Sequence, residues 1–142
     1  MSNERDSYAY FTIVSSSSLA ELDALMGFSC DGKCWSKGDP RTSRDQSLHT
    51  FSRWSLLSGV ERGRPIDEHL RALWCRMADC RESIIDLPEE VYRSVSCVGV
   101  FNSHLDTVEI ASGHFRTAAY YNLNLDCDFY YDDDLDKPDW SW

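Results

Sequence analysis

One segment has a helical pattern strong enough to constrain the fold of the whole chain. The residues that follow Pro65 predict a long amphipathic helix, because apolar side chains recur at steps of three and four positions. These apolar residues are Ile66, Leu70, Leu73, Trp74, Met77, Ile84 and Ile85. Charged residues of both signs occupy the other positions, and Pro88 ends the pattern. A helix of this kind buries its apolar stripe against a second layer of structure.

The second layer is predicted to be a β-sheet. Four segments have the β-branched, aromatic or alternating pattern that is typical of strands: residues 8–14, 51–57, 91–101 and 123–131. A shorter strand is also expected at residues 107–110. The segment 29–50 is polar and contains Gly and Pro, so it is predicted to be a long loop.

Two shorter helices complete the predicted order of elements. Ser18 and Glu21 match a capping box, which predicts that a helix begins after Ser18. Gly27 is a residue at which this helix can end. A last helix is expected from residue 112 to about residue 121. The order β-α-β-α-β-β-α-β predicts an α+β fold, with a mostly antiparallel sheet and helices packed on one face.

The length and the charge limit the domain organisation and the partners. A chain of 142 residues fits one domain, and we expect a single α+β domain over residues 1–131 with an acidic, aromatic tail over residues 132–142. The formal net charge is −10, and residues 126–142, with seven Asp and one Lys, contribute −6 of it. Phosphate backbones and anionic lipids repel such a chain, so neither direct nucleic-acid binding nor membrane binding is expected.

The compartment is predicted from what the sequence lacks. The first residues show no basic region followed by an apolar run, as a secretory signal would. No apolar stretch reaches the roughly 18 residues of a membrane span. We therefore expect a cytoplasmic protein, in which cysteines remain thiols rather than forming a disulfide framework.

The six cysteines fall into two groups. Two lie within predicted strands and are expected to be buried: Cys97 and Cys127. The other four form two close pairs, Cys30 with Cys34 and Cys75 with Cys80. Their spacings are at the edge of those that structural zinc sites use, so ordinary thiols are favoured while a zinc or redox role stays open.

Three short motifs occur in a characteristic order along the chain. They are Trp35-x-Lys37-Gly38-Asp39-x-Arg41, Trp54-Ser55-Leu56 and Leu125-Asp126-Cys127-Asp128-Phe129-Tyr130. Together with the order of strands and helices, they make the chain resemble a family of small bacterial proteins known as domain of unknown function 4279, over roughly residues 8–131. The resemblance implies a small α+β domain, and it brings no reaction with it.

The acidic C-terminal region is the first candidate site. Carboxylates steer a cationic partner, and aromatic side chains supply the anchors of an interface. The candidate partner-binding residues are Asp126, Asp128, Tyr131, Asp132, Asp133, Asp134, Asp136 and Trp140. They suggest an inhibitor or immunity-type protein that neutralises a basic partner, either a toxin nuclease or a nucleic-acid-binding defence complex. A solvated terminus that only aids solubility is the alternative, and the oligomeric state is left open.

A second hypothesis is a small-ligand pocket, in a sensor or an enzyme. Its candidate residues are Trp35, Lys37, Asp39, Arg41, Arg53 and Trp54, because Lys and Arg beside Trp can hold an anionic ligand. A packed turn with an Asp39–Arg41 ion pair is the alternative for this loop.

Support for catalysis or a resident metal is thin. The four histidines are scattered, His69 is expected to be solvated on the polar side of the long helix, and no motif of a nucleophile or a zinc protease occurs. The acidic run 132–136 lacks the glycine and the closing glutamate of a calcium loop. We therefore expect a protein that is not an enzyme, with no catalytic residues, no metal and no cofactor.

Overall fold

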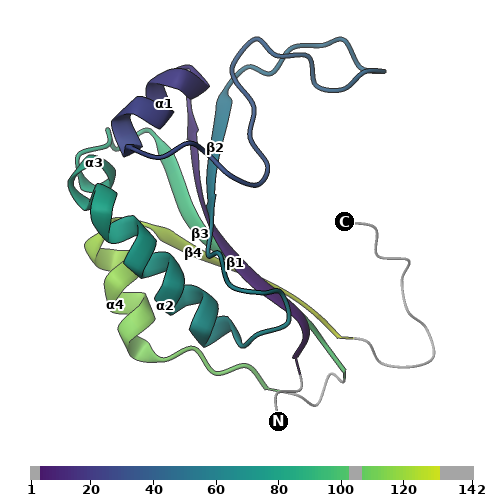
Figure 1. Cartoon of the computed structure of the whole chain (residues 1–142), viewed down its shortest axis with the longest axis vertical. Coiled ribbons are helices and arrows are strands. Elements are labelled where there is room, and N and C mark those ends of the chain that lie inside the picture. The colour runs from purple at the N-terminus through teal and green to yellow at the C-terminus, as the bar shows by residue number, and fades with distance from the viewer. Residues whose placement is uncertain (1–3, 103–106, 132–142) are drawn as a thin grey trace.

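Four segments form the sheet, and along each of them successive side chains point to opposite faces. The computed structural model describes residues 4–102 and 107–131, and places the strands side by side in the order β2-β1-β3-β4 (Figure 1). The strands are β1 (Glu4–Ser15), β2 (Ser52–Leu57), β3 (Tyr92–Phe101) and β4 (Asn124–Tyr131). The predicted α+β class is confirmed. β1 is antiparallel to β2 and β3, but β4 runs parallel to β3, so the sheet is mixed.

The parallel pair follows from the way in which β3 and β4 are connected. Neighbouring parallel strands need a crossover that returns the chain along the sheet, and α4 (Ser112–Tyr120) lies in that crossover. Residues 107–110, which were predicted to form a strand, lead into α4 and form no strand. With this exception the elements follow the predicted order.

The helices lie on one face of the sheet (Figure 1). α1 (Leu19–Met26) begins and ends as predicted: the Ser18 hydroxyl accepts the Glu21 N–H at 3.2 Å, and Gly27 has a φ of 77°. The predicted long helix is divided into α2 (Ile66–Met77), the 3₁₀ turn η1 (Ala78–Cys80) and α3 (Arg81–Ile85). The residues of the turn include no Gly or Pro, so the sequence contains no signal for this division.

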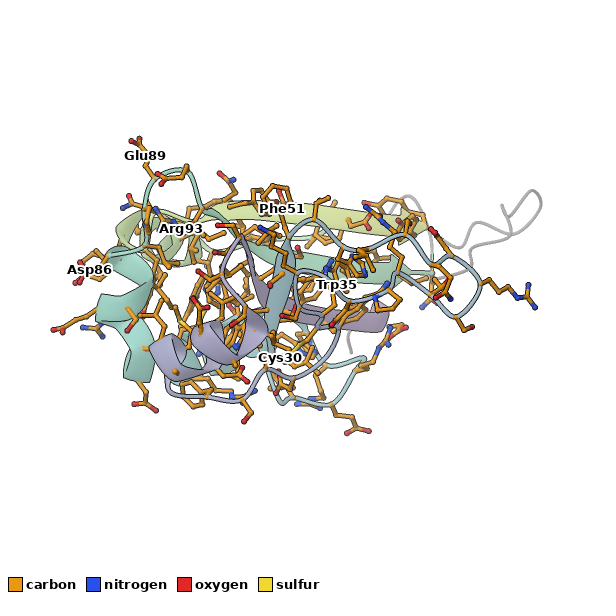
Figure 2. The ribbon with its side chains drawn as sticks, turned by 90° about the horizontal axis from the view of Figure 1, so that it is seen from above. Cys30, Trp35, Phe51, Asp86, Glu89 and Arg93 are labelled. Carbon is orange, nitrogen blue, oxygen red and sulfur yellow. A yellow bond between two sulfur atoms is a disulfide. The ribbon has the colours of Figure 1, made fainter. Side chains whose placement is uncertain are left out.

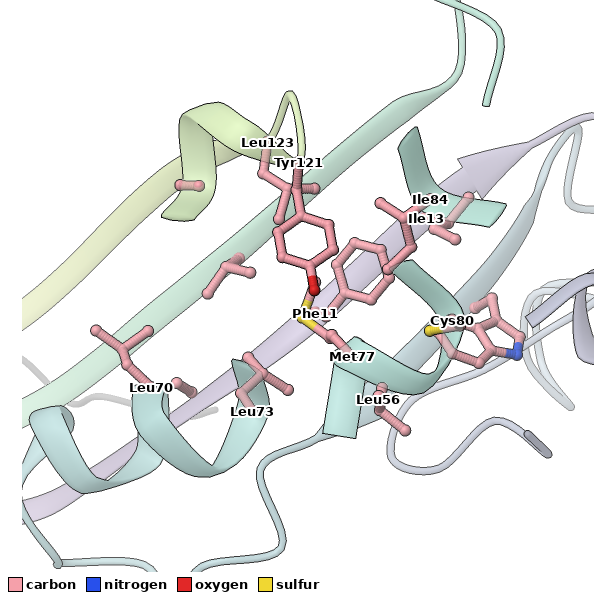
Figure 3. Packing of buried hydrophobic residues seen from close by; sticks show 14 of the residues in the cluster. Phe11, Ile13, Leu56, Leu70, Leu73, Met77, Cys80, Ile84, Tyr121 and Leu123 are labelled. Atoms are coloured by element: carbon pink, nitrogen blue, oxygen red, sulfur yellow. The ribbon is translucent and has the colours of Figure 1, made fainter. Parts of the chain in front are cut away.

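The apolar faces of the sheet and the helices meet in one core (Figure 3). Phe11 of β1 and Trp54 of β2 are fully buried and pack edge to face, with ring centroids 5.9 Å apart. The helices contribute buried side chains at Leu22, Met26, Ile66, Leu70, Leu73, Met77 and Ile84. Since these helices all pack on one side, the other face of the sheet has no described helix over it.

A buried arginine ties the end of the helical layer to the sheet. Arg93 of β3 is 7% exposed, and its guanidinium donates to the carbonyl oxygens of Ile84, Leu87 and Asn122 at 3.1, 3.0 and 3.2 Å. Three main-chain acceptors thereby satisfy a charged side chain that would be costly to bury alone. Figure 2 shows that the Asp86 and Glu89 side chains at the same end of the molecule point outward.

Candidate functional site

The face of the sheet opposite the helices presents the alternate positions of its strands. We call it the open face, and its principal residues are Tyr8, Tyr10, Arg53, Ser55, Leu57, Val98, Asp126, Asp128 and Tyr130. Strand register aligns them in rows. Tyr8, Val98 and Asp128 form one row across β1, β3 and β4. Leu57, Tyr10, Ser96 and Asp126 form the next.

Arginines and aromatic rings form a continuous series of contacts over β1 and β2. The Arg62 guanidinium lies 4.1 Å from the ring centroid of Tyr8, and the rings of Tyr8 and Tyr10 stack at 6.1 Å. Arg53 lies 5.7 Å from the ring of Tyr10 and 5.5 Å from the ring of Trp35. These distances fall within the range of cation–π contacts, so the rings and cations hold one another in place.

A pocket of about 310 Å³ opens between the positive and negative sides of the open face. Lys33 and Arg53 line it on the β2 side, and Asp128 lines it on the β4 side. The tyrosines of β1 lie between them, together with Ser55, Leu57 and Val98. Three strand spacings of about 4.8 Å separate the backbones of β2 and β4. The open face is thus polarised, with cations at one edge and carboxylates at the other.

Two tyrosines of this face, Tyr8 and Tyr130, have a raised pKa. Burial raises the pKa of Tyr8, and the Arg62 guanidinium opposes only part of that shift. A hydrogen bond with the Asp128 carboxylate raises the pKa of Tyr130. Tyr92 similarly donates its hydroxyl to Asp126, at 3.0 Å. The acidic side of the open face therefore combines carboxylates with the phenol groups that hydrogen-bond to them.

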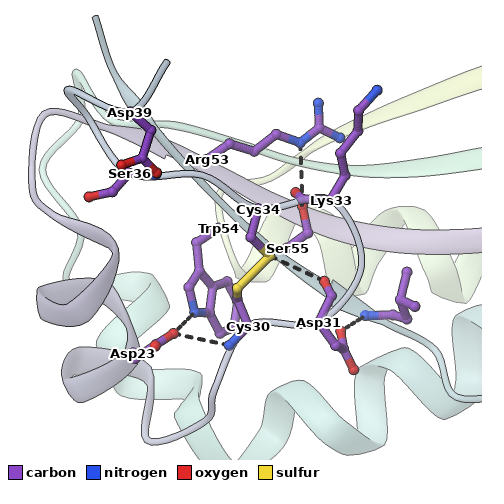
Figure 4. The surroundings of a disulfide bond; sticks show 11 residues. Asp23, Cys30, Asp31, Lys33, Cys34, Ser36, Asp39, Arg53, Trp54 and Ser55 are labelled. Carbon is purple, nitrogen blue, oxygen red and sulfur yellow. Dashed lines mark hydrogen bonds between the residues drawn. A yellow bond between two sulfur atoms is a disulfide. The ribbon is translucent and has the colours of Figure 1, made fainter. Parts of the chain in front are cut away.

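The β2 edge of the sheet is blocked by the loop that precedes it (Figure 4). Trp35 and Arg53 exchange two main-chain hydrogen bonds of 3.1 and 2.9 Å. The Asp31 N–H donates to the Ser55 carbonyl at 2.9 Å, and the Asp31 carboxylate accepts the N–H of Leu57 at 2.6 Å. The outward main-chain groups of β2 are thus largely occupied within the chain.

A disulfide closes the turn that blocks this edge. Cys30 and Cys34 are bonded to each other, so the prediction that these two cysteines are thiols is wrong (Figure 4). The Asp23 carboxylate holds the turn onto the core, because it accepts both the Cys30 N–H at 3.0 Å and the Trp54 indole N–H at 2.8 Å. Short spacing alone does not distinguish a disulfide from two thiols, which is why the sequence left this pair open.

The remaining cysteines are free thiols. Cys97 is buried as predicted, and burial raises its pKa to about 12. Cys127 is exposed, so the prediction that it is buried is wrong; it lies on the edge strand, where the neighbouring elements do not enclose it. Cys75 is exposed while Cys80 is buried, so this pair does not converge on a common site.

Over residues 124–129 the outer edge of β4 is free within the described part of the chain, in contrast to the β2 edge. β4 is the last strand of the sheet and pairs only with β3. Within the described part of the chain, the main chain of residues 124–129 makes no hydrogen bond on its outer side. The Asp126 and Asp128 side chains are exposed and alternate along this strand on the open face. Residues 124–129 therefore offer main-chain donors and acceptors with no outer partner among the described residues, next to two carboxylates.

The structure describes three of the predicted partner-binding residues. Asp126 and Asp128 lie together on the open face, whereas Tyr131 packs toward the core, with its ring 5.6 Å from that of Phe101. The other five lie outside the described residues: Asp132, Asp133, Asp134, Asp136 and Trp140.

The structure brings together only part of the predicted ligand pocket. Arg53 and Trp35 meet on the open face, but Trp54 points to the opposite side of β2 and is fully buried, so it lines no surface pocket with them. The remaining three residues, Lys37, Asp39 and Arg41, are exposed on a hairpin-like arm that extends away from the sheet (Figure 1). The Asp39 carboxylate accepts the Ser36 N–H at 2.8 Å and forms no ion pair with Arg41.

Two histidines, His69 and His114, are held by hydrogen bonds inside the fold. His69 is fully buried, so the expectation of a solvated side chain is wrong: the α2 face that carries it packs against the sheet, and its Nδ1 meets the Ser58 hydroxyl at 2.7 Å. His114 accepts the Trp74 indole N–H at 3.0 Å and meets the Asp67 carboxylate at 2.7 Å. Because indole only donates, the second His114 nitrogen carries the proton and donates to Asp67. Both nitrogens of His114 are thus occupied.

Sequence reasoning missed the residues that form the centre of the open face. These are Tyr8, Tyr10, Lys33 and Arg62. A signal for the two tyrosines was present, because the period of a strand places them on one face while Ala9 and Phe11 point to the other. No comparable signal identifies Lys33 or Arg62, which come from loops and reach the sheet only through the tertiary fold.

The described residues form neither a metal-binding cluster nor a membrane-spanning helix. Among residues 4–102 and 107–131, no three or more His, Cys, Asp or Glu side chains are arranged to hold a metal ion. No helix in these ranges has both the length and the apolar character needed to cross a bilayer.

The fold and the open face define a small α+β domain with a one-sided helical layer and an exposed, polarised sheet surface. The family described as domain of unknown function 4279 matches residues 5–132, and the chain belongs to this family. No curated protein and no solved structure matches the chain.

Proposed function

We propose that this protein acts by binding another protein at the acidic side of its open face and along the free edge of β4. The observation that carries the proposal is the position of the Asp126 and Asp128 carboxylates beside the main-chain groups of residues 124–129, which have no outer partner within the described residues. An exposed strand edge is a template for an added strand. The blocked β2 edge leaves β4 as the place where a strand can join.

The charge on β4 specifies the chemistry of the partner segment. Side chains of adjacent strands pair across the sheet, and opposite charges there are stabilising. Asp126 and Asp128 are two residues apart and exposed on the same face. An added strand with Lys or Arg at every second position would place its cations beside them. The proposed partner is therefore an extended, basic protein segment with alternating charge.

We propose that this binding serves an inhibitory or immunity-type role. A basic toxin nuclease or a nucleic-acid-binding defence protein carries cations that meet phosphates, and carboxylates can occupy them instead. The seven Asp of residues 126–142 add charge that would speed the encounter. The tyrosines near Asp126 and Asp128 would provide anchoring surface.

Peptide binding tests the proposal directly. The probe is a blocked octapeptide, as long as the 8 residues of β4, in which Lys alternates with Thr and Val. Its matched control has the same composition with all Lys contiguous. Isothermal titration calorimetry at low salt should show the alternating peptide binding several-fold more tightly. Equal affinity for the two peptides would contradict strand addition, and so would the absence of binding to either.

N-methylation separates strand addition from simple electrostatic adsorption. Successive amides of a strand point to opposite sides, so only one alternate set can donate to β4. Methylating that set should abolish binding, while methylating the other set should leave it nearly unchanged. If both methylated peptides bind as well as the parent, the β4 edge is not used.

A second candidate function is the binding of a small ligand in the open-face pocket. The pocket of about 310 Å³ with Lys33, Arg53 and Asp128 on its sides favours a dipolar or anionic molecule. A thermal-shift screen of amino acids and small organic acids would detect it as a ligand-dependent rise in Tm. The shift should disappear in Arg53→Ala and persist in Arg41→Ala, because Arg41 lies on the arm, away from the pocket lining.

A further inference from the structure

A groove in the helical layer carries two arginines and a wall of aromatic rings. It has a volume of about 500 Å³, and its lining includes Trp74, Arg81, Arg116, Thr117, Tyr120 and Tyr121. The groove runs between the junction of α2 with α3 and the helix α4, so it belongs to the layer that covers the other face of the sheet. It is therefore separate from the open face, and the inference below does not depend on the proposed function.

The two arginines of the groove differ from the other arginines of the helical layer. Arg64 and Arg71 form ion pairs with Glu68 and Asp67, each with a distance of 2.8 Å. Within the described ranges, Arg81 and Arg116 pair with no carboxylate, although the chain as a whole has 24 acidic residues. The contact of Arg116 is a hydrogen bond of 3.5 Å to the Ser112 hydroxyl. Two guanidinium groups thus line one groove without a carboxylate partner among the described residues.

Neighbouring tyrosines hold Arg81 in position. Its guanidinium lies 5.9 Å from the ring centroid of Tyr120. A hydrogen bond with the Tyr121 hydroxyl raises the pKa of Arg81, so the group remains a cation. A guanidinium positioned before a ligand arrives loses less side-chain entropy on binding it. Arg81 is thus prearranged to receive an anion.

The aromatic wall gives the groove a flat apolar surface. The rings of Trp74 and Tyr121 stack with centroids 6.1 Å apart and planes 10° from parallel. Tyr120 packs edge-on against Tyr121 at 5.8 Å and is 60% exposed. An exposed ring of this kind beside two cations can stack on a planar ligand. The groove could therefore bind an anionic group and a planar ring of the same ligand next to each other.

We propose that this groove binds a small organic phosphate that carries a planar ring, of the class of a nucleoside monophosphate. The phosphate would lie between the guanidinium groups of Arg81 and Arg116, whose planar fork matches phosphate oxygens. The ring would lie on the exposed face of Tyr120. The volume of the groove falls within the range of small-molecule sites, about 300–1,000 Å³.

Calorimetry with adenosine monophosphate as the probe tests this assignment. We expect saturable one-to-one binding by the full chain at low salt. Adenosine lacks the phosphate, and inorganic phosphate lacks the ring. The affinity of the protein for each of them should therefore be lower than that for adenosine monophosphate by a factor of about ten or more. No binding of adenosine monophosphate at millimolar concentration would overturn the proposal. Equal affinity for adenosine would remove the role of the arginines, and equal affinity for inorganic phosphate would remove the role of the ring.

Matched arginine variants locate the site. Arg116→Gln should weaken binding of adenosine monophosphate about tenfold or more, because it removes one charge-assisted contact. Arg64→Gln removes the same charge elsewhere on the helical layer and should leave the affinity within about twofold. Equal weakening by both variants would show a general charge effect and overturn the assignment. The Trp74 indole N–H signal in a two-dimensional NMR spectrum should shift with ligand while that of Trp54 should not; the reverse would place the ligand elsewhere.

Discussion

At the scale of single residues, buried polar groups do more to shape this molecule than its exposed charges. Arg93 donates to three carbonyl oxygens near the ends of α3 and α4. His69 is enclosed between α2 and the sheet and meets the Ser58 hydroxyl. From the sequence alone, both polar side chains would be assigned to the surface. Their hydrogen-bond partners inside the protein become known only from the fold.

Arg93→Met should destabilise the fold strongly. The substitution retains much of the side-chain volume but removes the charged donor from three carbonyl oxygens, of which that of Ile84 keeps the Leu87 N–H as a donor. We therefore expect the free energy of unfolding to fall by about 3 kcal/mol. Urea denaturation followed by tryptophan fluorescence measures this. The matched control is Arg44→Met on the exposed arm, for which a change within about 0.5 kcal/mol is expected. A similar small change in Arg93→Met would show that the carbonyl contacts contribute little.

His69 should make stability depend on pH. Burial is the main cause that lowers the pKa of His69 below 6.5 in the folded protein. Between that lowered pKa and the unfolded value, the unfolded chain binds the additional proton, so stability is complete above about pH 6.5 and falls as the pH decreases. The urea midpoint should therefore drop more between pH 7.5 and pH 5.5 in the wild type than in His69→Asn. Equal drops would rule out His69 as the source.

At the scale of elements, the molecule treats the two edges of its sheet differently. The segment 29–35 pairs with β2, and the Cys30–Cys34 disulfide closes its turn. Residues 124–129 of β4 have no such cover within the described residues. Under the proposed function, this asymmetry, rather than any single side chain, would direct a partner strand toward β4.

Removing the disulfide should loosen the blocked edge. A bond that closes so short a loop constrains the unfolded chain only modestly, so Cys30→Ser/Cys34→Ser should lower the free energy of unfolding by about 2 kcal/mol or less. Amide hydrogen exchange should accelerate at Arg53 and Leu57, whose N–H groups donate to this loop, while amides between β1 and β3 keep their protection. Unchanged exchange at both residues would show that the loop stays in place without the disulfide.

Most elements, but not their contacts, can be predicted from this sequence. The capping box at Ser18, the glycine stop at Gly27 and the alternation of β2 are local signals, and the structure confirms them. The parallel direction of β4 could not be predicted, because it depends on how far α4 returns along the sheet. The open-face site was predicted only in part, since Lys33 and Arg62 come from loops that only the tertiary fold brings beside Tyr8 and Tyr10.

At the scale of the whole molecule, the charge is distributed unevenly between regions. The C-terminal 17 residues, 126–142, account for −6 of the net −10. On the described sheet, carboxylates gather at the β4 side, while Lys33 and Arg53 lie toward β2. The helical layer holds a separate pair of arginines, Arg81 and Arg116, which have no carboxylate partner among the described residues. A basic protein segment and an anionic small molecule would thus meet different faces of the same domain.

The most direct test of the central claim is the affinity of the alternating Lys peptide for two double variants with the same change in charge. Asp126→Asn/Asp128→Asn should weaken binding about tenfold and reduce its dependence on salt, because two cross-strand charge pairs are lost. Glu89→Gln/Glu90→Gln alters exposed carboxylates at the turn before β3 and should leave the affinity within about twofold. Equal affinities of the two variants would contradict partner binding along β4.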